Sequence, residues 1–181
     1  MVEILKNTNQ VNNRLIFKCL STSGVCGFEL RKAHYHLGVE LAKQIVNQRN
    51  LSNSKVAVLI MMRAGLPFGM GIADSLEESN DITILFSTNE NDFSTYDTVV
   101  IADAVINTGK TIAEIERQIK DKKVIIATNV ISAKYLDNLK ELDIFATRIS
   151  DRSYEGIATK TISNGKGPDT GERLFKNTFF K

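Results

Sequence analysis

Cysteine is scarce in this chain, which contains only Cys19 and Cys26. A framework of disulfide bonds is therefore not expected, and we predict a cytoplasmic protein. No apolar run approaches the ~20 residues that a membrane-spanning helix needs, and residues 1–6 lack the apolar core of a signal peptide, so we expect no membrane contact. The net charge of +2 is too small to indicate a nucleic-acid-binding protein.

Positive charge is missing from the middle of the chain, because no Lys or Arg occurs between Arg63 and Lys110. One interpretation is a solvated acidic face. The other is that Arg63 and Lys110, each next to a tight turn, flank one anion site.

Apolar strand patterns and helical patterns alternate along the sequence. The length of 181 residues and the hydrophobic content of 43% predict one domain with a substantial core. The alternation predicts an α/β fold in which helices cover both faces of a parallel sheet. The expected strands are 14–20, 55–62, 82–86, 98–102, 123–130 and 144–149, and the expected helices are 28–48, 68–76, 108–120 and 133–140, with a loop at 87–96.

The most informative segment runs from Val99 to Ile112. An apolar strand ends in Asp103, a short polar turn containing Gly109 follows, and a helical pattern then begins. This order places a carboxylate and several backbone N–H groups at the carboxyl end of a strand, where open α/β sheets bind small ligands. The N–H groups attract phosphate. Asp103 repels phosphate but can accept hydrogen bonds from sugar hydroxyls, so the segment suggests a ribose-phosphate ligand.

Two other interpretations of this segment stay open. Residues 104–111 fit a relaxed phosphate loop of a nucleoside triphosphatase, with Ala104 in place of the first Gly. Against it, two other strands precede the segment, and no later strand ends in an Asp that would help to hold Mg²⁺. The segment also fits an ordinary strand-to-helix turn that Thr108 caps.

A second turn favours the ligand site. Residues 59–67 also end a buried strand with a charged residue, Arg63, and a tight turn. In a parallel sheet both turns face the same edge, so Arg63 would lie beside Asp103. Its guanidinium can bind a phosphate or pyrophosphate through two parallel hydrogen bonds. Gly65 would let backbone amides approach the same ligand.

Taken together, these residues resemble the type I phosphoribosyltransferases. The segment 99–111 is similar to their binding motif for phosphoribosyl pyrophosphate (PRPP), and within that family the chain most resembles the uracil phosphoribosyltransferases. Residues 63–66 look like the pyrophosphate loop of that branch, 28–31 like the start of its N-terminal helix, and 165–175 like its C-terminal signature with Pro168 added.

The resemblance implies a pentosyltransferase of pyrimidine salvage. Such an enzyme transfers the phosphoribosyl group of PRPP to uracil, which gives UMP and pyrophosphate. It also implies a core at about 28–150 and a small hood built from residues 1–27 and 151–181, within a single domain of residues 1–181.

The resemblance assigns roles to individual residues. Arg63 and Asp103 are the expected catalytic residues, Asp103 on the ribose hydroxyls and Arg63 on the pyrophosphate. We expect Mg²⁺ to be held mainly by PRPP and not by protein ligands. The PRPP site would comprise Arg63, Ala64, Gly65, Asp103, Ala104, Asn107, Thr108, Gly109, Lys110, Thr111 and Asp169, and the base pocket Ile162, Gly167, Asp169 and Thr170.

The chain departs from the family pattern at several positions. Ala104 stands where many relatives have a second acid, and Lys110 stands where the uracil branch usually has a second Gly. Residues 82–97 form a short segment without the Arg that the family places there, and Pro168 removes one N–H group from the base pocket. A transferase for another base therefore stays open, as does a non-catalytic nucleotide-sensing or RNA-binding regulator on the same fold.

Some residues are interpreted without a ligand. His34 and His36 lie two apart on an expected helix and face different ways, so we expect solvated or half-buried histidines and no metal pair. Cys19 and Cys26 are expected to be small buried hydrophobes, and residues 61–62 to be core. We expect a homodimer, with residues 179–180 and the N-terminal helix either in the contact or closing the core.

Overall fold

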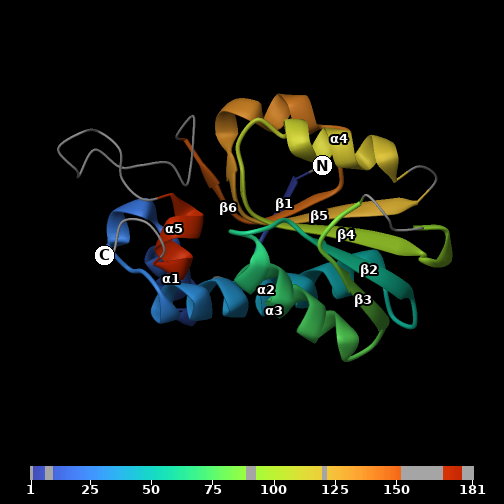
Figure 1. Cartoon of the computed structure of the whole chain (residues 1–181), viewed down its shortest axis with the longest axis horizontal. Helices are drawn as coiled ribbons and strands as arrows, with labels where there is room; N and C mark the ends of the chain where they lie inside the picture. Colours follow the sequence, from blue (N-terminus) through green and yellow to red (C-terminus); the bar gives the residue numbers. More distant parts are fainter. Residues whose placement is uncertain (1, 7–9, 89–92, 120–121, 152–168, 177–181) are drawn as a thin grey trace.

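The computed structural model describes residues 2–6, 10–88, 93–119, 122–151 and 169–176. Within them, six parallel strands form one sheet in the order β1-β6-β5-β4-β2-β3 (Figure 1). The α/β class predicted from the sequence is therefore correct. The strands are β1 (Val2–Ile4), β2 (Lys55–Ile60), β3 (Asp81–Leu85), β4 (Thr98–Ile106), β5 (Lys123–Ser132) and β6 (Ile144–Ser150).

Helices cover both faces of the sheet. In Figure 1, α2 (Phe28–Arg49) and α3 (Leu66–Glu77) lie below it, while α4 (Lys110–Gln118) and the 3₁₀ segment η3 (Ala133–Leu139) lie above it. Successive side chains of β2 point to opposite faces of the sheet. Val58 belongs to the core between the sheet and the helices α2 and α3, and Leu59 belongs to the core between the sheet and α4. A strand that is buried on both faces has a continuous apolar sequence, as residues 56–60 of β2 do.

The N-terminal region differs from the prediction. Residues 14–20 were expected to form a strand, but α1 (Gln10–Cys19) is a helix, followed by the 3₁₀ turn η1 (Ser21–Ser23). Leu15 packs on the core, Cys19 is buried and Phe17 is 61% exposed. The spacing of four between Leu15 and Cys19 is helical, whereas the apparent alternation of 15, 17 and 19 suggested a strand. The first residues, expected in the hood, form β1 on the edge of the sheet beside β6.

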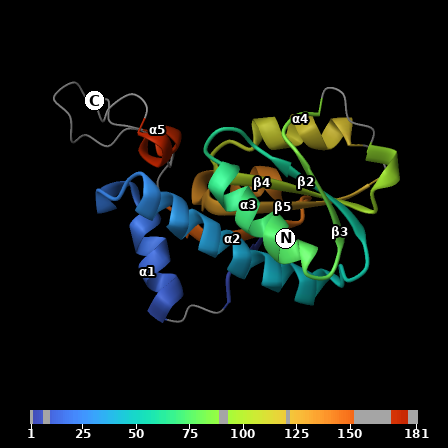
Figure 2. The ribbon, with the colours of Figure 1, turned by 60° about the horizontal axis from the view of Figure 1, so that its bottom comes forward.

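The C-terminal helix α5 (Thr170–Phe175) is joined to the N-terminal region at one end of the molecule (Figure 2). Arg173 is 5% exposed, and its Nη2 donates to the carbonyl oxygens of Leu20 and Val25 at 3.0 and 2.9 Å. Arg31 of α2 donates to the Leu174 carbonyl oxygen at 2.7 Å. These bonds hold the second half of α5 against α2 and against residues 20–25 that precede it.

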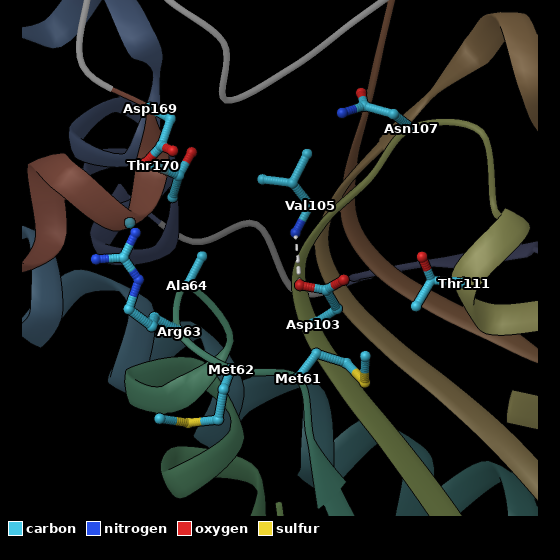
Figure 3. Close-up of a pocket in the computed structure, with 11 residues that line it drawn as sticks. Met61, Met62, Arg63, Ala64, Asp103, Val105, Asn107, Thr111, Asp169 and Thr170 are labelled. Carbon is cyan, nitrogen blue, oxygen red and sulfur yellow. Dashed lines mark hydrogen bonds between the residues drawn. The ribbon is translucent and has the colours of Figure 1, made fainter. Parts of the chain in front are cut away.

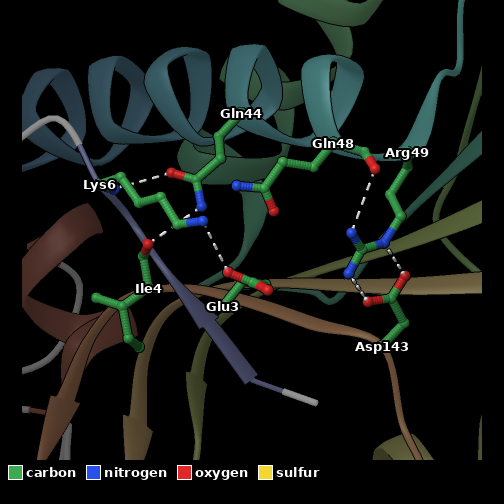
Figure 4. Close-up of polar contacts among 7 residues, drawn as sticks. All are labelled: Glu3, Ile4, Lys6, Gln44, Gln48, Arg49 and Asp143. Carbon is green, nitrogen blue, oxygen red and sulfur yellow. Dashed lines mark hydrogen bonds and ion pairs between the residues drawn. The ribbon is translucent and has the colours of Figure 1, made fainter.

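Polar contacts attach the far end of α2 to the sheet edge (Figure 4). Arg49 donates to both carboxylate oxygens of Asp143, at 2.6 and 2.5 Å, and its guanidinium lies 4.7 Å from the centre of the Phe145 ring. Gln44 exchanges hydrogen bonds with the backbone of Ile4 and Lys6. None of the helices in the described ranges is long and apolar enough to cross a membrane.

Candidate active site

The site lies where two neighbouring strands, β2 and β4, end at different points along the sheet. β2 ends at Ile60, which pairs with Ala102, whereas β4 continues to Ile106 and stays paired with β5. Asp103 was expected at the end of its strand, but it lies inside β4, directly past the last residue that β2 covers. The longer strand leaves one side of the Asp103 backbone uncovered by β2, and the loop after β2 comes to lie there.

That loop places Arg63 in the lining of the same cavity as Asp103. Residues 61–65 lead from β2 into α3, and the Met62–Arg63 peptide is cis. A Cβ at Gly65 would lie 2.9 Å from the Ala102 carbonyl oxygen and 3.3 Å from the Asp103 Cα. Gly65 thus permits close packing of the loop on β4. Its amide donates to the Met61 carbonyl oxygen at 2.9 Å, so its role differs from the expected approach to a ligand.

One cavity of about 420 Å³ lies between the loop, β4 and α5 (Figure 3). Figure 3 places Arg63 with Asp169 and Thr170 on one side, Asn107 and Thr111 on the opposite side, and Asp103 between them. The lining residues are Met61, Met62, Arg63, Ala64, Asp103, Val105, Asn107, Thr111, Asp169, Thr170 and Gly171. Two turns and a C-terminal helix, distant in the sequence, therefore face one space.

Asp103 is the perturbed group of this cavity. Burial raises the pKa of its carboxyl from the ordinary 3.8 to about 6, and hydrogen bonds from the backbone of Val105 and Ala104 oppose that rise. The Val105 amide lies 3.4 Å from Oδ1. Hydroxyl groups of a ligand would stabilise the charged form of this carboxylate, because their hydrogen bonds would replace those that it loses to water on burial.

The turn after β4 has the geometry of an anion cradle. Gly109 adopts a left-handed backbone, with φ of 71°, and a Cβ there would lie 2.3 Å from a methyl carbon of Leu139. Residues 107–111 surround an adjoining hollow of about 190 Å³ that also touches Asp103. α4 begins at Lys110, so the positive end of its dipole and its first N–H groups lie at this hollow.

α5 supplies the third wall through a capping box. The Asp169 carboxylate accepts from the Glu172 amide at 2.7 Å, while Glu172 accepts from the Asp169 amide at 2.9 Å. This reciprocal pair starts the helix and directs Thr170 and Gly171 to the cavity. The spacing of Asp169 and Glu172 was a sequence signal for a helix start that the prediction did not use.

The structure gathers most of the predicted site residues. Arg63, Ala64, Asp103, Asn107, Thr111, Asp169 and Thr170 line the main cavity, and Thr108, Gly109 and Lys110 line the adjoining hollow. Ala104 is fully buried and does not line either space, because its side chain alternates to the other face of β4. Ile162 and Gly167 lie outside the described residues.

Some lining residues were missed, and one histidine was misjudged. Met61 and Met62 were expected in the core; Met61 packs against the core and also lines the cavity, whereas Met62 lines the cavity and is 55% exposed. Val105 also lines it. His34 was expected to be solvated or half-buried, but it is 1% exposed because its side of α2 faces the core, while His36 is exposed.

Two carboxylates line the main cavity. Among the described residues, no group of three or more His, Cys, Asp or Glu is arranged to hold a metal ion. The carboxylates that line the main cavity are Asp103 and Asp169. Mg²⁺ commonly binds through one or two carboxylates together with substrate phosphates, and this pair fits such an ion.

Two solved structures share this fold. The AQ2163 protein from Aquifex aeolicus matches with a TM-score of 0.72 and 18% identity, over 99% of this chain and 100% of that one. The hypoxanthine-guanine phosphoribosyltransferase of Schistosoma mansoni, solved in complex with IMP, matches with a TM-score of 0.51 and 18% identity over 67% of each chain. No curated protein matches the chain in sequence.

A family-level comparison agrees with the arrangement of the site. The sequence profile of the uracil phosphoribosyltransferases matches residues 8–177, which include the Arg63 loop, β4 with its turn, and α5. The fold is that of the type I phosphoribosyltransferases, and the protein is by family and fold a phosphoribosyltransferase. Because the match spans nearly the whole chain, this protein belongs to the uracil phosphoribosyltransferase family.

Proposed function

We propose that the protein transfers the phosphoribosyl group of PRPP to uracil, releasing pyrophosphate. The observation that carries the proposal is the main cavity with its adjoining hollow, which together offer the Arg63 cation, the Asp103 carboxylate as a hydroxyl acceptor, and the anion cradle of the turn 107–111. PRPP presents a pyrophosphate, two ribose hydroxyls and a phosphate monoester in the same order. The family match supports uracil as the base.

The turn holds one end of the donor. The 5-phosphate occupies the hollow at 107–111, where backbone N–H groups and the start of α4 stabilise its charge. The ribose hydroxyls donate to Asp103. With the 5-phosphate and the ribose hydroxyls held in this way, the anomeric carbon would lie in the main cavity and its leaving group would point toward Arg63, which lies across the cavity from Asn107 (Figure 3).

Reaction at the anomeric carbon needs charge stabilisation more than a protein nucleophile. The bond from this carbon to the pyrophosphate oxygen breaks with its electron pair going to pyrophosphate, a bond to the uracil nitrogen forms, and the proton of that nitrogen passes to the departing pyrophosphate. Positive charge develops on the ring and negative charge on the leaving group, as in glycoside hydrolysis. Arg63 stabilises the departing pyrophosphate, and α5 positions the base through Asp169 and Thr170. Mg²⁺ carried by PRPP would neutralise further charge on the pyrophosphate.

The direct test is a base screen. Purified protein with PRPP and Mg²⁺ is offered uracil, orotate, hypoxanthine, guanine or xanthine, and nucleotide formation is measured. We expect turnover with uracil alone. Turnover with a purine would instead support the second candidate, a transferase for another base, which Lys110 in the phosphate turn favours. Binding of structured RNA that resists added salt, without turnover, would support a regulator.

The Arg63 role has its own test. Arg63→Ala is expected to lower kcat by about 10²–10³-fold, by analogy with the loss of one donor to a developing charge. Arg117→Ala is the matched control, because Arg117 is exposed on α4 and lies outside the cavity. Equal turnover of the two variants would remove Arg63 from the mechanism without affecting the family assignment.

A further inference from the structure

One wall of the main cavity is the start of α5, and it consists of Asp169, Thr170 and Gly171 (the α5 wall). Asp169 is the N-cap of the helix, and the other two residues begin its first turn. α5 has only six residues. A helix this short is marginal by itself, because its few backbone hydrogen bonds do not repay the cost of nucleation. The geometry of the wall therefore depends on side-chain contacts.

The two halves of α5 are held differently. The second half is fixed to its neighbours: the Gly27 amide donates to the Arg173 carbonyl oxygen at 2.8 Å, and Arg31 donates to the Leu174 carbonyl oxygen at 2.7 Å. The Arg173 side chain adds the bonds to residues 20–25 described above. In the described ranges, no hydrogen bond joins residues 169–171 to another element. The half that lines the cavity is thus the less firmly held one.

Glu172 supplies the contact that holds this half. Its carboxylate accepts from the Asp169 amide at 2.9 Å, and its own amide donates to Asp169 Oδ1 at 2.7 Å. A Cβ at Gly171 would lie 3.3 Å from the same oxygen, so the Asp169 carboxylate lies close over the first turn. With Oδ1 bound to the helix, Oδ2 stays available to the cavity. Glu172 itself does not line the cavity, so it acts through Asp169.

We propose that Glu172 is a positioning residue, whose side chain keeps the α5 wall in the conformation that binds the base. The effect on the base rests on the proposed function, in which Asp169 and Thr170 position uracil. Without the Glu172 side chain, the wall would exchange between an ordered and a frayed form while the second half of α5 stays in place. Because the base binds only the ordered form, its apparent affinity falls with the ordered fraction. Saturating base restores the ordered form and therefore restores kcat.

Amide hydrogen exchange measured by NMR tests the ordering without any substrate. In Glu172→Ala, we expect the amides of residues 169, 172 and 173 to exchange roughly three- to tenfold faster, as the loss of a helix cap predicts. The Gly27 amide reports on the second half of α5 and should keep its rate. Equal acceleration at Gly27 would show that the whole helix detaches, and the proposal would be overturned. Unchanged rates at residues 169 and 172 would overturn it as well.

Three substitutions of Glu172 separate reach from charge. A capping box needs the length of Glu or Gln at this position, so Glu172→Gln should keep the bond to the Asp169 amide without the charge. Glu172→Asp keeps the charge on a side chain that is too short. We expect the KM for uracil to rise roughly three- to tenfold in the Ala and Asp variants, with kcat within about twofold of the unaltered protein, and to be restored in the Gln variant.

Glu114→Ala is the matched control, because Glu114 is exposed on α4 and lines neither the cavity nor the adjoining hollow. Restoration of KM by Asp and not by Gln would assign the effect to charge and refute the positioning role. If Glu172→Ala does not fold, the Asp and Gln variants still give the comparison. Absence of turnover in the unaltered protein would refute the proposed function, whereas the exchange rates would still decide the role of Glu172.

Discussion

Replacing Asp103 by Asn should make the protein more stable and less active. The raised pKa of Asp103 means that the folded protein holds its proton up to about pH 6, whereas an unfolded chain releases it near 3.8. A difference of about two pKa units corresponds to about 3 kcal/mol by which the charged carboxylate destabilises the fold above pH 6. Asn keeps the shape and can accept from the Val105 amide without charge. We therefore expect Asp103→Asn to raise Tm at pH 7.5 by roughly 6–12 °C.

The pH dependence distinguishes this cause from a change in packing. A carboxyl with a raised pKa contributes stability that is fully present below about pH 4 and is lost as the pH rises through 6. The advantage of Asp103→Asn should therefore be largest above pH 6, shrink between pH 6 and 4, and vanish below. Differential scanning calorimetry at half-unit intervals measures it. Asp137→Asn is the control, because the Asp137 side chain is 85% exposed on η3.

Activity should change in the opposite direction. Charge-assisted hydrogen bonds from ribose hydroxyls contribute about 1.5–3 kcal/mol each, so Asp103→Asn should lower kcat/KM for PRPP by at least about tenfold. The unaltered protein should lose kcat/KM as the pH falls below about 6, when Asp103 becomes protonated. An Asp103→Asn variant that is no more stable than the unaltered protein at pH 7.5 would refute the reasoning from burial. Unchanged kcat/KM would refute the ribose role.

Three further predictions concern other parts of the chain. Gly109→Ala should raise KM for PRPP and destabilise the fold by about 1–3 kcal/mol, because the left-handed backbone and Leu139 leave no room for a Cβ; steady-state kinetics and calorimetry measure both. Asp143→Asn should lower Tm by roughly 2–4 °C through loss of about 1 kcal/mol with Arg49, and leave KM unchanged. If the expected homodimer buries Phe17, which is 61% exposed, Phe17→Ser should shift sedimentation equilibrium toward monomer; a monomeric unaltered protein would contradict the dimer.

The convergence of Arg63 and Asp103 could be predicted because it follows from sheet geometry. Two buried strands that end in charged residues and tight turns must present those ends on one edge when the sheet is parallel. The exact strand length could not be read in this way. Residues 103–106 continue β4 because β5 extends beside them, and that pairing depends on residues 25 positions later in the sequence, such as Thr128 opposite Asp103.

The strand predicted at 14–20 and the exposure predicted for His34 were wrong because both depend on which residues are buried, and burial is decided by tertiary contacts. The apolar residues of 14–20 fitted two periods, and only the packing of Leu15 and Cys19 on α2 and its neighbours decides for a helix. His34 carries no local sign of its burial, because the groups around it come from α5, β5 and β6. By contrast, the spacing of Asp169 and Glu172 was a local signal, and it could have placed the start of α5.

Two of the unfavourable burials among the described residues border the same residue, Val105. On one side Asp103 holds a carboxyl whose charge burial opposes, and on the other His34 has two ring nitrogens without partners. An apolar side chain at either position would stabilise the fold if stability alone mattered. Residues that break a local rule in this way are expected where a ligand completes the arrangement. Ribose hydroxyls would complete Asp103, so substrate binding should stabilise the wall that contains Val105.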